Sequence, residues 1–451
     1  MSFDAKKAEE MFSFVENAPG EKSEIYDCRE NCFMRLYSGV TAEEYGSFVK
    51  ELQNDGYILL ECTENNGNRF ALLKKDKTVT LYYTPCDSSL RVTACENALI
   101  PALEPQVSAG NVQTTFFAFE NDHTLIDCGM CLLVQCRDSS FFVIDSGHYF
   151  QFNDNDRLYK FMRERTPAGQ KVVINGWFIT HAHTDHVSKL IDFLKYNTDD
   201  VVIEGFYQNL LSADYPNDFG NHEEKEIAVK LFDILEKYPA PVYKLHSGMR
   251  FYVRELAFDV LFTHEDIFPE ILDDYNDSSC VLMMTAEGSK VFIPGDAAVL
   301  ASKTLEKRFG ESLKCDVVQV AHHGHTGLSA DCYTLLSGDT AIFPVTRIMF
   351  EQDIKLHEAD RRAVELAGRY FITGDGTVCV PLPYERDKVY ALPDETVEDF
   401  EKIKRVWRYA YTDEYMDYIY GKFIENGGDP DKLLLPSSPH GWIEPKPWIG
   451  D

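Results

Sequence analysis

Apolar and polar positions follow two different patterns along this chain, and the change between them marks its predicted domains. From about residue 113 to residue 383, short apolar runs alternate with stretches of helical period. Strands that alternate with helices are typical of α/β proteins in which helices cover a sheet. The sequence therefore predicts a layered α/β body over residues 113–383.

The chain before this body predicts a small α+β domain over residues 1–108. Thr41 and Glu44 have the spacing of a capping box, which predicts a helix start there. Runs at 31–37, 57–63, 69–74 and 78–84 alternate like antiparallel strands, and the proline-containing stretch 99–112 predicts a linker.

The last part of the chain, residues 384–451, differs again in composition. Aromatic-rich amphipathic stretches predict helices at 397–411 and 413–425. We interpret this part as a helical extension of the body. Within the body, we expect strands at 114–119, 125–135, 140–144, 172–179 and 201–208, and a final strand pair at 370–373 and 377–380.

The most informative stretch is Thr180–His186, which follows the apolar run Val172–Ile179. It contains three histidines and one aspartate, although the whole chain has only 13 His in 451 residues. The preceding run predicts a strand and the following residues predict a helix. A turn of this kind lies at the edge of a sheet, where α/β proteins bind ligands.

Three other predicted strands also end in groups that can ionise. Asp145 follows one apolar run and Asp296 follows another, and a third run leads into His322, His323 and His325. Asn276–Cys280 places polar groups at the start of a strand. Several loops could thus contribute to one site at a sheet edge.

These residue types suit a site for two metal ions. His181 and His183 can bind one ion, while Asp185 and His186 are positioned for a second, and Asp296 can bridge the two. Histidine with aspartate favours zinc, with manganese or iron as alternatives. Two ions would activate a bridging water and stabilise a developing oxyanion.

The stretch His181–His186 matches the HxHxDH signature, and the chain resembles the metallo-β-lactamase-fold hydrolases. The order of Asn276–Val281, Gly295-Asp296 and His322-His323 is most similar to the hydrolase domain of the competence protein ComEC. The resemblance implies a four-layer αββα sandwich with the metal cleft at one edge. It also implies hydrolysis by a metal-bound hydroxide, with Asp145 as a structural acid behind the site.

The same resemblance implies the metal ligands and the catalytic groups. It assigns His181 and His183 to the first ion, Asp185 and His186 to the second, and Asp296 as the bridge. One of His322 and His323 completes the second site, and the other acts on the substrate or leaving group. Both therefore stay candidates for metal binding and, with Asp185, for catalysis.

The chain departs from the family pattern in two places. Many members have a further histidine for the first ion, where this chain has Tyr275–Ser279; Asp277 or Asn276 is the expected substitute. Competence-type proteins usually have serine at the position of His325. His222, His246 and His264 lie between the motifs but have the contexts of surface or core residues.

Composition restricts the classes of substrate and the cellular compartments that are expected. The family resemblance implies cleavage of a phosphodiester or other ester-like bond. The net charge of −30 opposes binding of long nucleic acid and favours a small molecule or a short oligonucleotide. No signal peptide or apolar run long enough for a membrane helix is recognisable, so we expect a cytoplasmic protein with no membrane contact. We expect its 12 cysteines to be reduced, with Cys128 and Cys131 in the core.

Two other functions remain open from the sequence. An iron-dependent oxidoreductase can use the same fold, although diiron flavoproteins typically have glutamate at the position of His183 and carry a flavodoxin domain, which is not recognisable here. A non-catalytic metal-binding sensor is the other alternative. The sequence does not indicate an oligomeric state.

Overall fold

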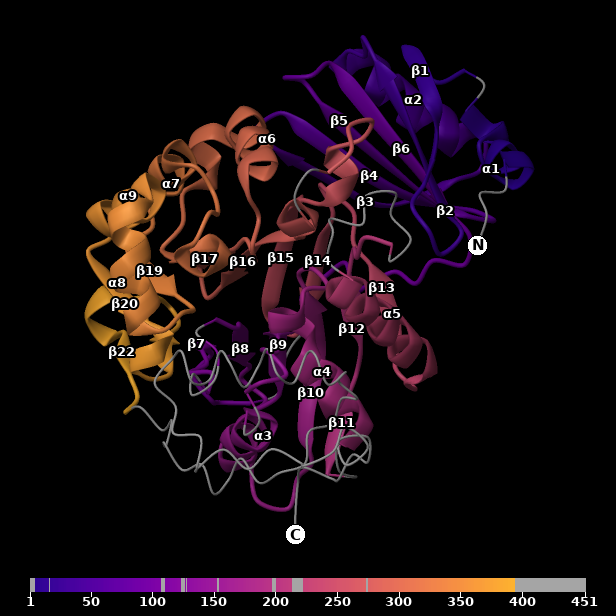
Figure 1. Ribbon diagram of the computed structural model, residues 1–451. Coiled ribbons are helices and arrows are strands. Elements are labelled where there is room, and N and C mark those ends of the chain that lie inside the picture. The colour runs from indigo at the N-terminus through magenta and orange to yellow at the C-terminus, as the bar shows by residue number, and fades with distance from the viewer. Residues whose placement is uncertain are drawn as a thin grey trace.

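A computed structural model gives the arrangement of the chain (Figure 1). It describes residues 5–15, 17–106, 110–122, 126, 128–151, 154–196, 200–212, 222–272 and 275–393. The predicted helices at 397–411 and 413–425, and with them nearly all of the predicted extension, lie outside the described residues.

The N-terminal part forms a six-stranded antiparallel sheet with helices on one face. Its order is β1-β2-β6-β5-β4-β3. The strands are β1 (Glu21–Asp27), β2 (Cys32–Ser38), β3 (Ile58–Asn65), β4 (Asn68–Lys74), β5 (Thr78–Thr84) and β6 (Ser89–Cys95). The helices are α1 (Ala5–Met11), the 3-10 turn η1 (Ser13–Val15) and α2 (Ala42–Asn54). The capping box is confirmed, because Thr41 Oγ1 accepts from Glu44 N and the Glu44 carboxylate accepts from Thr41 N.

The first sheet of the body runs in the order β13-β12-β10-β9-β8-β7-β21-β22, with β11 also paired to β10. Its strands are β7 (Thr115–Ala118), β8 (Cys131–Gln135), β9 (Phe141–Asp145), β10 (Val172–Ile179), β11 (Val201–Ile203), β12 (Phe206–Gln208), β13 (Val242–Lys244), β21 (Val378–Pro381) and β22 (Tyr390–Ala391). The helices α3 (Asp154–Glu164), α4 (Thr184–Tyr196) and α5 (His222–Lys237) accompany it. The expected strand 201–208 is therefore two short strands along one edge of β10.

The second sheet has the order β14-β15-β16-β17-β18-β19-β20. Its strands are β14 (Arg250–Val253), β15 (Leu256–Phe262), β16 (Val281–Ala286), β17 (Ser289–Ile293), β18 (Val317–Gln319), β19 (Thr340–Phe343) and β20 (Arg369–Ile372). Its helices are α6 (Val299–Phe309), α7 (Ala330–Leu336), α8 (Arg347–Leu356) and α9 (Glu358–Leu366). The final strand pair expected from the sequence is wrong as a pair, because β20 lies beside β19 whereas β21 crosses to pair with β7 in the first sheet.

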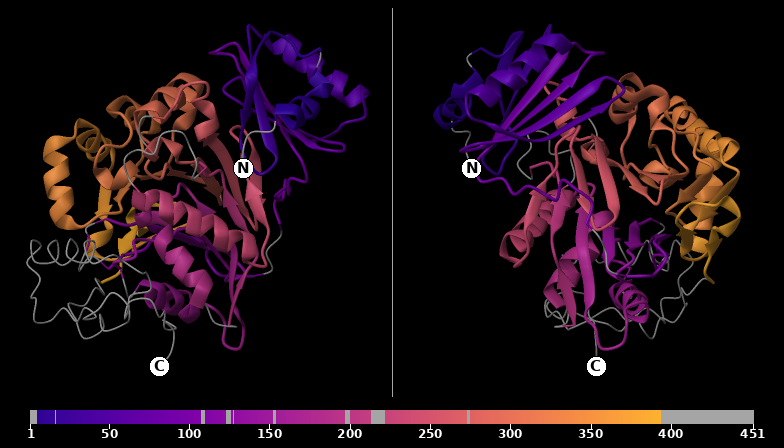
Figure 2. Two further views of the ribbon diagram at one scale, coloured as in Figure 1. Left: turned by 45° about the vertical axis from the view of Figure 1, so that its right-hand side comes forward. Right: turned by 180° about the vertical axis from the view of Figure 1, so that it is seen from behind.

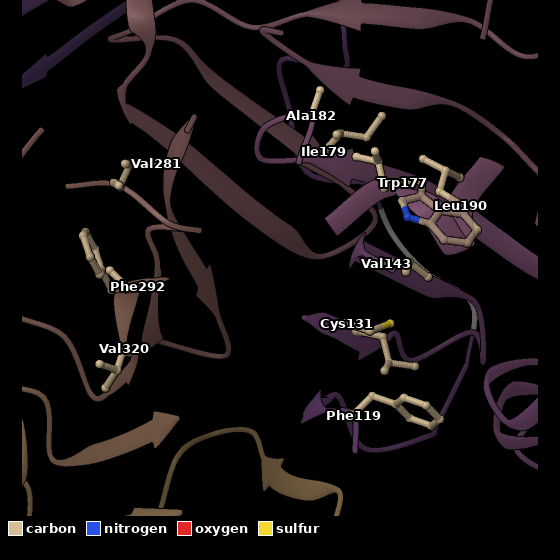
Figure 3. Close-up of a cluster of buried hydrophobic side chains, with 14 of the residues drawn as sticks. Phe119, Cys131, Val143, Trp177, Ile179, Ala182, Leu190, Val281, Phe292 and Val320 are labelled. Carbon is tan, nitrogen blue, oxygen red and sulfur yellow. The ribbon is translucent and has the colours of Figure 1, made fainter. Parts of the chain in front are cut away.

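The two body sheets pack face to face, and helices cover their outer faces (Figures 1 and 2). Neighbouring residues of β9 point to opposite faces of the first sheet. Phe142 contacts Phe258 of the opposite sheet, with ring centroids 4.5 Å apart. Val143 belongs to the core between the first sheet and its helices. Figure 3 shows this outer core, including Trp177 and Leu190. The predicted αββα architecture is confirmed.

The N-terminal sheet packs directly against the body. Phe70 and Tyr82 belong to the same buried cluster as Leu245 and Met249, and Asn68 Nδ2 donates to the carbonyl oxygen of Arg308 at 2.9 Å. The predicted linker is also anchored, since Ala102 forms a β-bridge with Tyr252. This contact brings apolar surface from both parts out of water, which stabilises their association.

One expectation about the cysteines is wrong. Cys32 and Cys95, opposite each other on β2 and β6, form a disulfide, whereas we expected all cysteines to be reduced. Cys131 is buried in the core as expected, and Cys128 is partly buried. No helix among the described residues combines the length and the apolar composition that a membrane span needs.

Candidate metal centre

The HxHxDH stretch lies where β10 ends and α4 begins. β10 is almost wholly buried because it is central in its sheet, and it ends at Ile179, so the following residues emerge at the sheet edge. Asp185 and His186 belong to the first turn of α4, and His186 N donates to the carbonyl oxygen of His183. His181 and His186 are fully buried. The strand-to-helix turn expected from the sequence is therefore present.

Four side chains from three segments, namely the first turn of α4 and the turns after β17 and β18, form the first of two groups that can hold a metal ion. Asp185, His186, Asp296 and His323 place one ligand atom each within 4.8 Å of one another. His323 Nε2 lies 2.9 Å from Asp185 Oδ2 and 3.4 Å from Asp296 Oδ2. His186 Nε2 lies 3.0 Å from the same Asp296 oxygen. We call these residues the Asp185 group.

The second group contains His181, His183 and Asp296, again with one ligand atom each within 4.8 Å. His181 Nε2 lies 3.9 Å from Asp296 Oδ2. The ring of Tyr275 stacks on His183, with centroids 4.9 Å apart and an angle of 22° between the planes. We call these three ligands the His181 group. Asp296 belongs to both groups, as expected for a bridging carboxylate.

Asp145 holds the motif from behind. Its carboxylate accepts hydrogen bonds from Thr180 N at 2.9 Å and Thr180 Oγ1 at 2.7 Å. Its Oδ2 also lies 2.7 Å from His186 Nδ1, so it orients the imidazole whose Nε2 faces Asp296. A carboxylate behind a ligand histidine fixes its tautomer and raises its basicity. These contacts match the supporting role that the sequence suggested for Asp145.

Gly295 brings Asp296 against the motif. It has φ +59°, and a Cβ there would lie 2.8 Å from Thr180 Cβ. A side chain would therefore strain the backbone and push the loop away from Thr180. Gln319 Oε1 accepts from Gly295 N and fixes the same turn from β18. The glycine before Asp296 thus allows the close approach of the two strand ends.

The sequence left open which of His322 and His323 is the metal ligand. The structure places the two side chains differently. Both have positive φ, 50° and 58°, in the turn after β18. His323 points into the Asp185 group and its Nδ1 lies 2.8 Å from the Pro344 carbonyl oxygen. His322 belongs to neither group; its Nε2 lies 3.4 Å from Asn276 Nδ2. His325 pairs with Asp353, Nδ1 to Oδ2 2.6 Å, and also lies outside both groups.

Neither expected substitute for the missing histidine belongs to the His181 group. Asp277 accepts hydrogen bonds from the backbone N–H of Ala298, Leu300 and Ala301, and so caps α6. Asn276 faces His322 instead. The carboxylate of Asp277 is committed to the helix terminus because unpaired N–H groups there attract negative charge. Within the described residues, the His181 group has no further histidine, cysteine or acid.

The charges of the centre are strongly coupled. Burial opposes charge at Asp185 and Asp296, but the nearby His186 and His323 hold the pKa of both carboxyls well below the usual range. Despite its burial, His323 has its pKa raised to about 10 by Asp296 and Asp185. By contrast, burial and the neighbouring imidazoles hold the pKa of His181 well below its usual value. Protons on His186 and His323 would leave when a cation binds in their place.

The donor atoms fit divalent metal ions. His181 Nε2 and Asp296 Oδ1 are buried and make no hydrogen bond among the described residues. Such atoms are costly to bury without a partner, and a cation supplies one. Imidazole nitrogens and carboxylate oxygens are ligands of zinc, iron and manganese. The chemistry of the set supports metal binding without deciding between these metals.

From the sequence, no functional role was predicted for two residues near the centre, Glu224 and Tyr275, and the role of a third, His148, was left open. Glu224 of α5 accepts from Thr184 N at 2.8 Å and from Thr184 Oγ1 at 3.1 Å; burial and Asp185 raise its pKa to about 8. Tyr275 covers His183. His148, for which the sequence was indecisive, is buried, and its Nδ1 accepts from Phe150 N. Glu224 carries no local signal, since it lies in a charged helical stretch.

A family model described as the metallo-beta-lactamase superfamily matches residues 107–341, just over half of the chain. The chain belongs to this superfamily. The match covers the HxHxDH loop, Asp296 and the His322-His323 turn, so this part of the recognition is confirmed. No match among the curated proteins is significant.

Solved structures match the chain at low identity, and one of them, YhfI, is described as a metallo-beta-lactamase fold protein. YhfI from Bacillus subtilis is 9% identical, with 57% of this chain and 96% of that one covered and a TM-score of 0.36. Yeast PDE1 is 12% identical, with 58% and 98% covered and a TM-score of 0.35. CmlA, a diiron β-hydroxylase from Streptomyces venezuelae, is 10% identical, with 62% and 55% covered and a TM-score of 0.36. These likenesses concern the fold alone.

Proposed function

We propose that the protein is a metal-dependent hydrolase with two divalent ions, in the first instance Zn²⁺. The observation that carries this proposal is Asp296, one buried carboxylate that belongs to both ligand groups. A carboxylate in that position could contact two ions, as a carboxylate does in two-metal hydrolytic sites. Membership of a superfamily that consists mostly of hydrolases supports the same reaction class.

Each ligand group would hold one ion. The His181 group would hold the first and the Asp185 group the second. With ions bound, these residues would hold a water whose pKa is lowered towards neutrality, and the ions would supply charge that stabilises a developing oxyanion. Asp145 and the Pro344 carbonyl oxygen hold His186 and His323 in orientation, so little reorganisation is needed when a substrate arrives.

His322 is our candidate for contact with the substrate. It lies beside the centre without joining either ligand group, and Asn276 and Thr326 flank its two ring nitrogens at 3.4 Å. An imidazole held next to an ester can donate a hydrogen bond to the leaving oxygen, provided that the reacting atoms come within hydrogen-bond reach. His323 is instead assigned to metal binding, and Asp185 to metal binding with an influence on the water.

The proposed substrate is a small molecule or short oligonucleotide with a phosphodiester or other ester-like bond. The order of motifs that is similar to the ComEC hydrolase domain supports a phosphodiester, and the net charge of −30 opposes long nucleic acid. The cytoplasmic location stays a prediction.

The experiment combines metal analysis with a substrate panel. Protein purified without added metal is analysed for zinc, manganese and iron, and the metal-replete protein is tested on phosphodiesters, lactones and thioesters. We expect hydrolysis that Asp296→Asn reduces by about 10³-fold or more, the effect of losing about 4 kcal/mol of transition-state stabilisation. Asp331→Asn, on an exposed position of α7, is the matched control and keeps full activity.

Three results would contradict the proposal. Stoichiometric iron with oxygen uptake would indicate an oxidoreductase on the same fold. Failure to cleave any member of the panel, together with an unchanged cellular role in Asp185→Ala, would indicate a non-catalytic sensor. Equal activity of Asp296→Asn and Asp331→Asn would exclude this centre as the site of hydrolysis.

A further inference from the structure

A second cluster of metal-binding side chains lies where the N-terminal sheet meets the body. Cys32 of β2 and Cys95 of β6 face His246, which follows β13 of the body, and one ligand atom from each lies within 4.8 Å of the others. His246 Nε2 is 3.9 Å from Cys95 Sγ. All three side chains are buried. The cluster therefore combines two sulfurs from one part of the protein with an imidazole from the other.

A carboxylate holds the imidazole in the orientation that a metal ligand needs. His246 Nδ1 lies 2.9 Å and 3.1 Å from the two oxygens of Glu265, which is itself fully buried. A carboxylate beside Nδ1 favours the tautomer with its proton on that nitrogen, which leaves the Nε2 lone pair directed at the sulfurs. The same pair of contacts supports histidines in zinc sites.

A third thiol lies in the same buried cluster. Cys28 packs with Cys32, Cys95 and Met34, and it starts a tight turn in which Cys28 N donates to the Cys32 carbonyl oxygen. Arg29, Glu30 and Asn31 between them all have positive φ, from 55° to 66°, and this tight turn returns the chain to Cys32. Cys28 lies outside the set of ligand atoms that are all within 4.8 Å of one another, so it is a candidate fourth ligand that its turn would have to bring closer. Three cysteines and one histidine are a tetrahedral donor set for structural zinc.

We infer that Cys32, Cys95 and His246, with Cys28 in the fourth position, form a structural Zn²⁺ site in the reduced protein. Cys32 and Cys95 are joined as a disulfide in this structure. A dithiol reductant that supplies two electrons breaks this bond, leaves two thiolates on the protein and is itself oxidised to a disulfide. Disulfide and ion exclude each other, because a sulfur in a disulfide has no negative charge and is a poor ligand, whereas the thiolate is the form that binds metal. Soft thiolates select zinc over magnesium, calcium or manganese.

The position of the site gives it a structural role. Its cysteines belong to the N-terminal sheet and its histidine to the body, so a bound ion ties the two parts together. Lys244 Nζ already donates to the Cys28 carbonyl oxygen beside it, and Gln208 Nε2 donates to Glu30 at 3.2 Å. A metal ion at this interface adds its binding free energy to the association of the two parts.

Cobalt distinguishes this site from the candidate metal centre. The two ligand groups there contain only histidine and aspartate, whereas Co²⁺ bound to thiolates gives an intense near-ultraviolet charge-transfer band. We therefore titrate Co²⁺ into the full-length protein, reduced and kept without oxygen. We expect the band to appear, to disappear on addition of Zn²⁺, and to be lost in Cys95→Ser. It weakens in Cys28→Ser, and zinc analysis shows one fewer ion per chain in Cys95→Ser.

Cys332→Ser is the matched control, because Cys332 is equally buried but lies on α7, in the second half of the body, and belongs to no metal group among the described residues. It keeps the band. Absence of the band from the reduced wild-type protein overturns the inference without relying on any variant that fails to fold. A band that persists in Cys95→Ser overturns it as well, and one unchanged in Cys28→Ser overturns the assignment of the fourth position.

Discussion

The two halves of the candidate metal centre differ in how completely the chain surrounds them. The Asp185 group has four ligands from three segments, and Asp145 and the Pro344 carbonyl oxygen orient its histidines. The His181 group has three ligands, one of them shared, and its neighbour Tyr275 contributes a stacked ring. Because tight binding needs both ligands and their support, we expect the Asp185 group to retain its ion when the His181 group has lost its own.

The largest effect is expected when a ligand of the fuller group is removed. His323→Ala should lower hydrolysis by about 10³-fold, because it removes one ion and disturbs Asp296, whereas His183→Ala should lower it by about 10²-fold. Metal analysis after stepwise chelation should show that His183→Ala keeps one ion bound and that His323→Ala binds its remaining ion weakly. Equal losses of metal in both variants would remove the proposed difference between the halves.

A smaller effect is expected from the support behind the motif. Asp145→Asn should lower activity or metal affinity by about 10–100-fold, the usual range for a group that orients a ligand histidine. Asparagine keeps the size of the side chain but accepts less strongly from Thr180 and His186. Metal titration of this variant beside wild type gives the measurement. An affinity unchanged at both sites would show that the orientation of His186 does not depend on Asp145.

A variant of Asp277 tests whether the His181 group has only the three ligands found among the described residues. Asp277→Ala should lower the free energy of unfolding by about 1–2 kcal/mol, through loss of the cap on α6, and leave the metal content unchanged. Denaturant unfolding and metal analysis of the same preparation measure both effects. Loss of an ion at unchanged stability would show that Asp277 is a ligand after all.

The smallest effect concerns Asp360 of α9, whose Oδ2 lies 3.5 Å from the position that a Cβ would take at Gly324, next to His323. Asp360 is buried, and burial together with Asp353 raises its pKa to about 8. The folded state therefore favours the protonated acid, so its contribution to stability is present at acidic pH and decreases as the pH rises towards 8. Asp360→Asn should raise the free energy of unfolding by about 1 kcal/mol at pH 9 and change it little at pH 4. The same gain at both pH values would exclude ionisation of Asp360 as the cause.

Residues whose role depends on their neighbours in sequence were predictable. The strand before Thr180, the helix after it and the capping box at Thr41 all follow from local patterns, and the αββα architecture follows from the family signature. Asp296 was identified because an acid directly after a buried strand and a glycine lies at a sheet edge.

Residues whose role depends on tertiary contacts were not predictable. Which of His322 and His323 points into the centre depends on the positive φ angles of both residues. These angles could not be predicted from two adjacent histidines in the sequence. Asp277 could not be recognised as a cap before α6 was placed against it. The strands near residues 370 and 380 were located correctly, but an apolar run carries no information about which sheet it will join. The edge strand β1 was missed because it is largely polar.

The short turn η2 (His264–Asp266) restricts how this protein can be divided. Glu265 pairs with His246. The carboxylate of the next residue, Asp266, accepts hydrogen bonds from Arg91 of the N-terminal sheet and from Arg308 of α6. Without the N-terminal sheet, Asp266 would lose one of its two guanidinium partners, and the apolar face that meets Phe70 and Tyr82 would be exposed to water. The body is therefore not a module that evolution or an engineer can detach by cutting at the linker. A fragment without residues 1–106 would need a new surface at this turn.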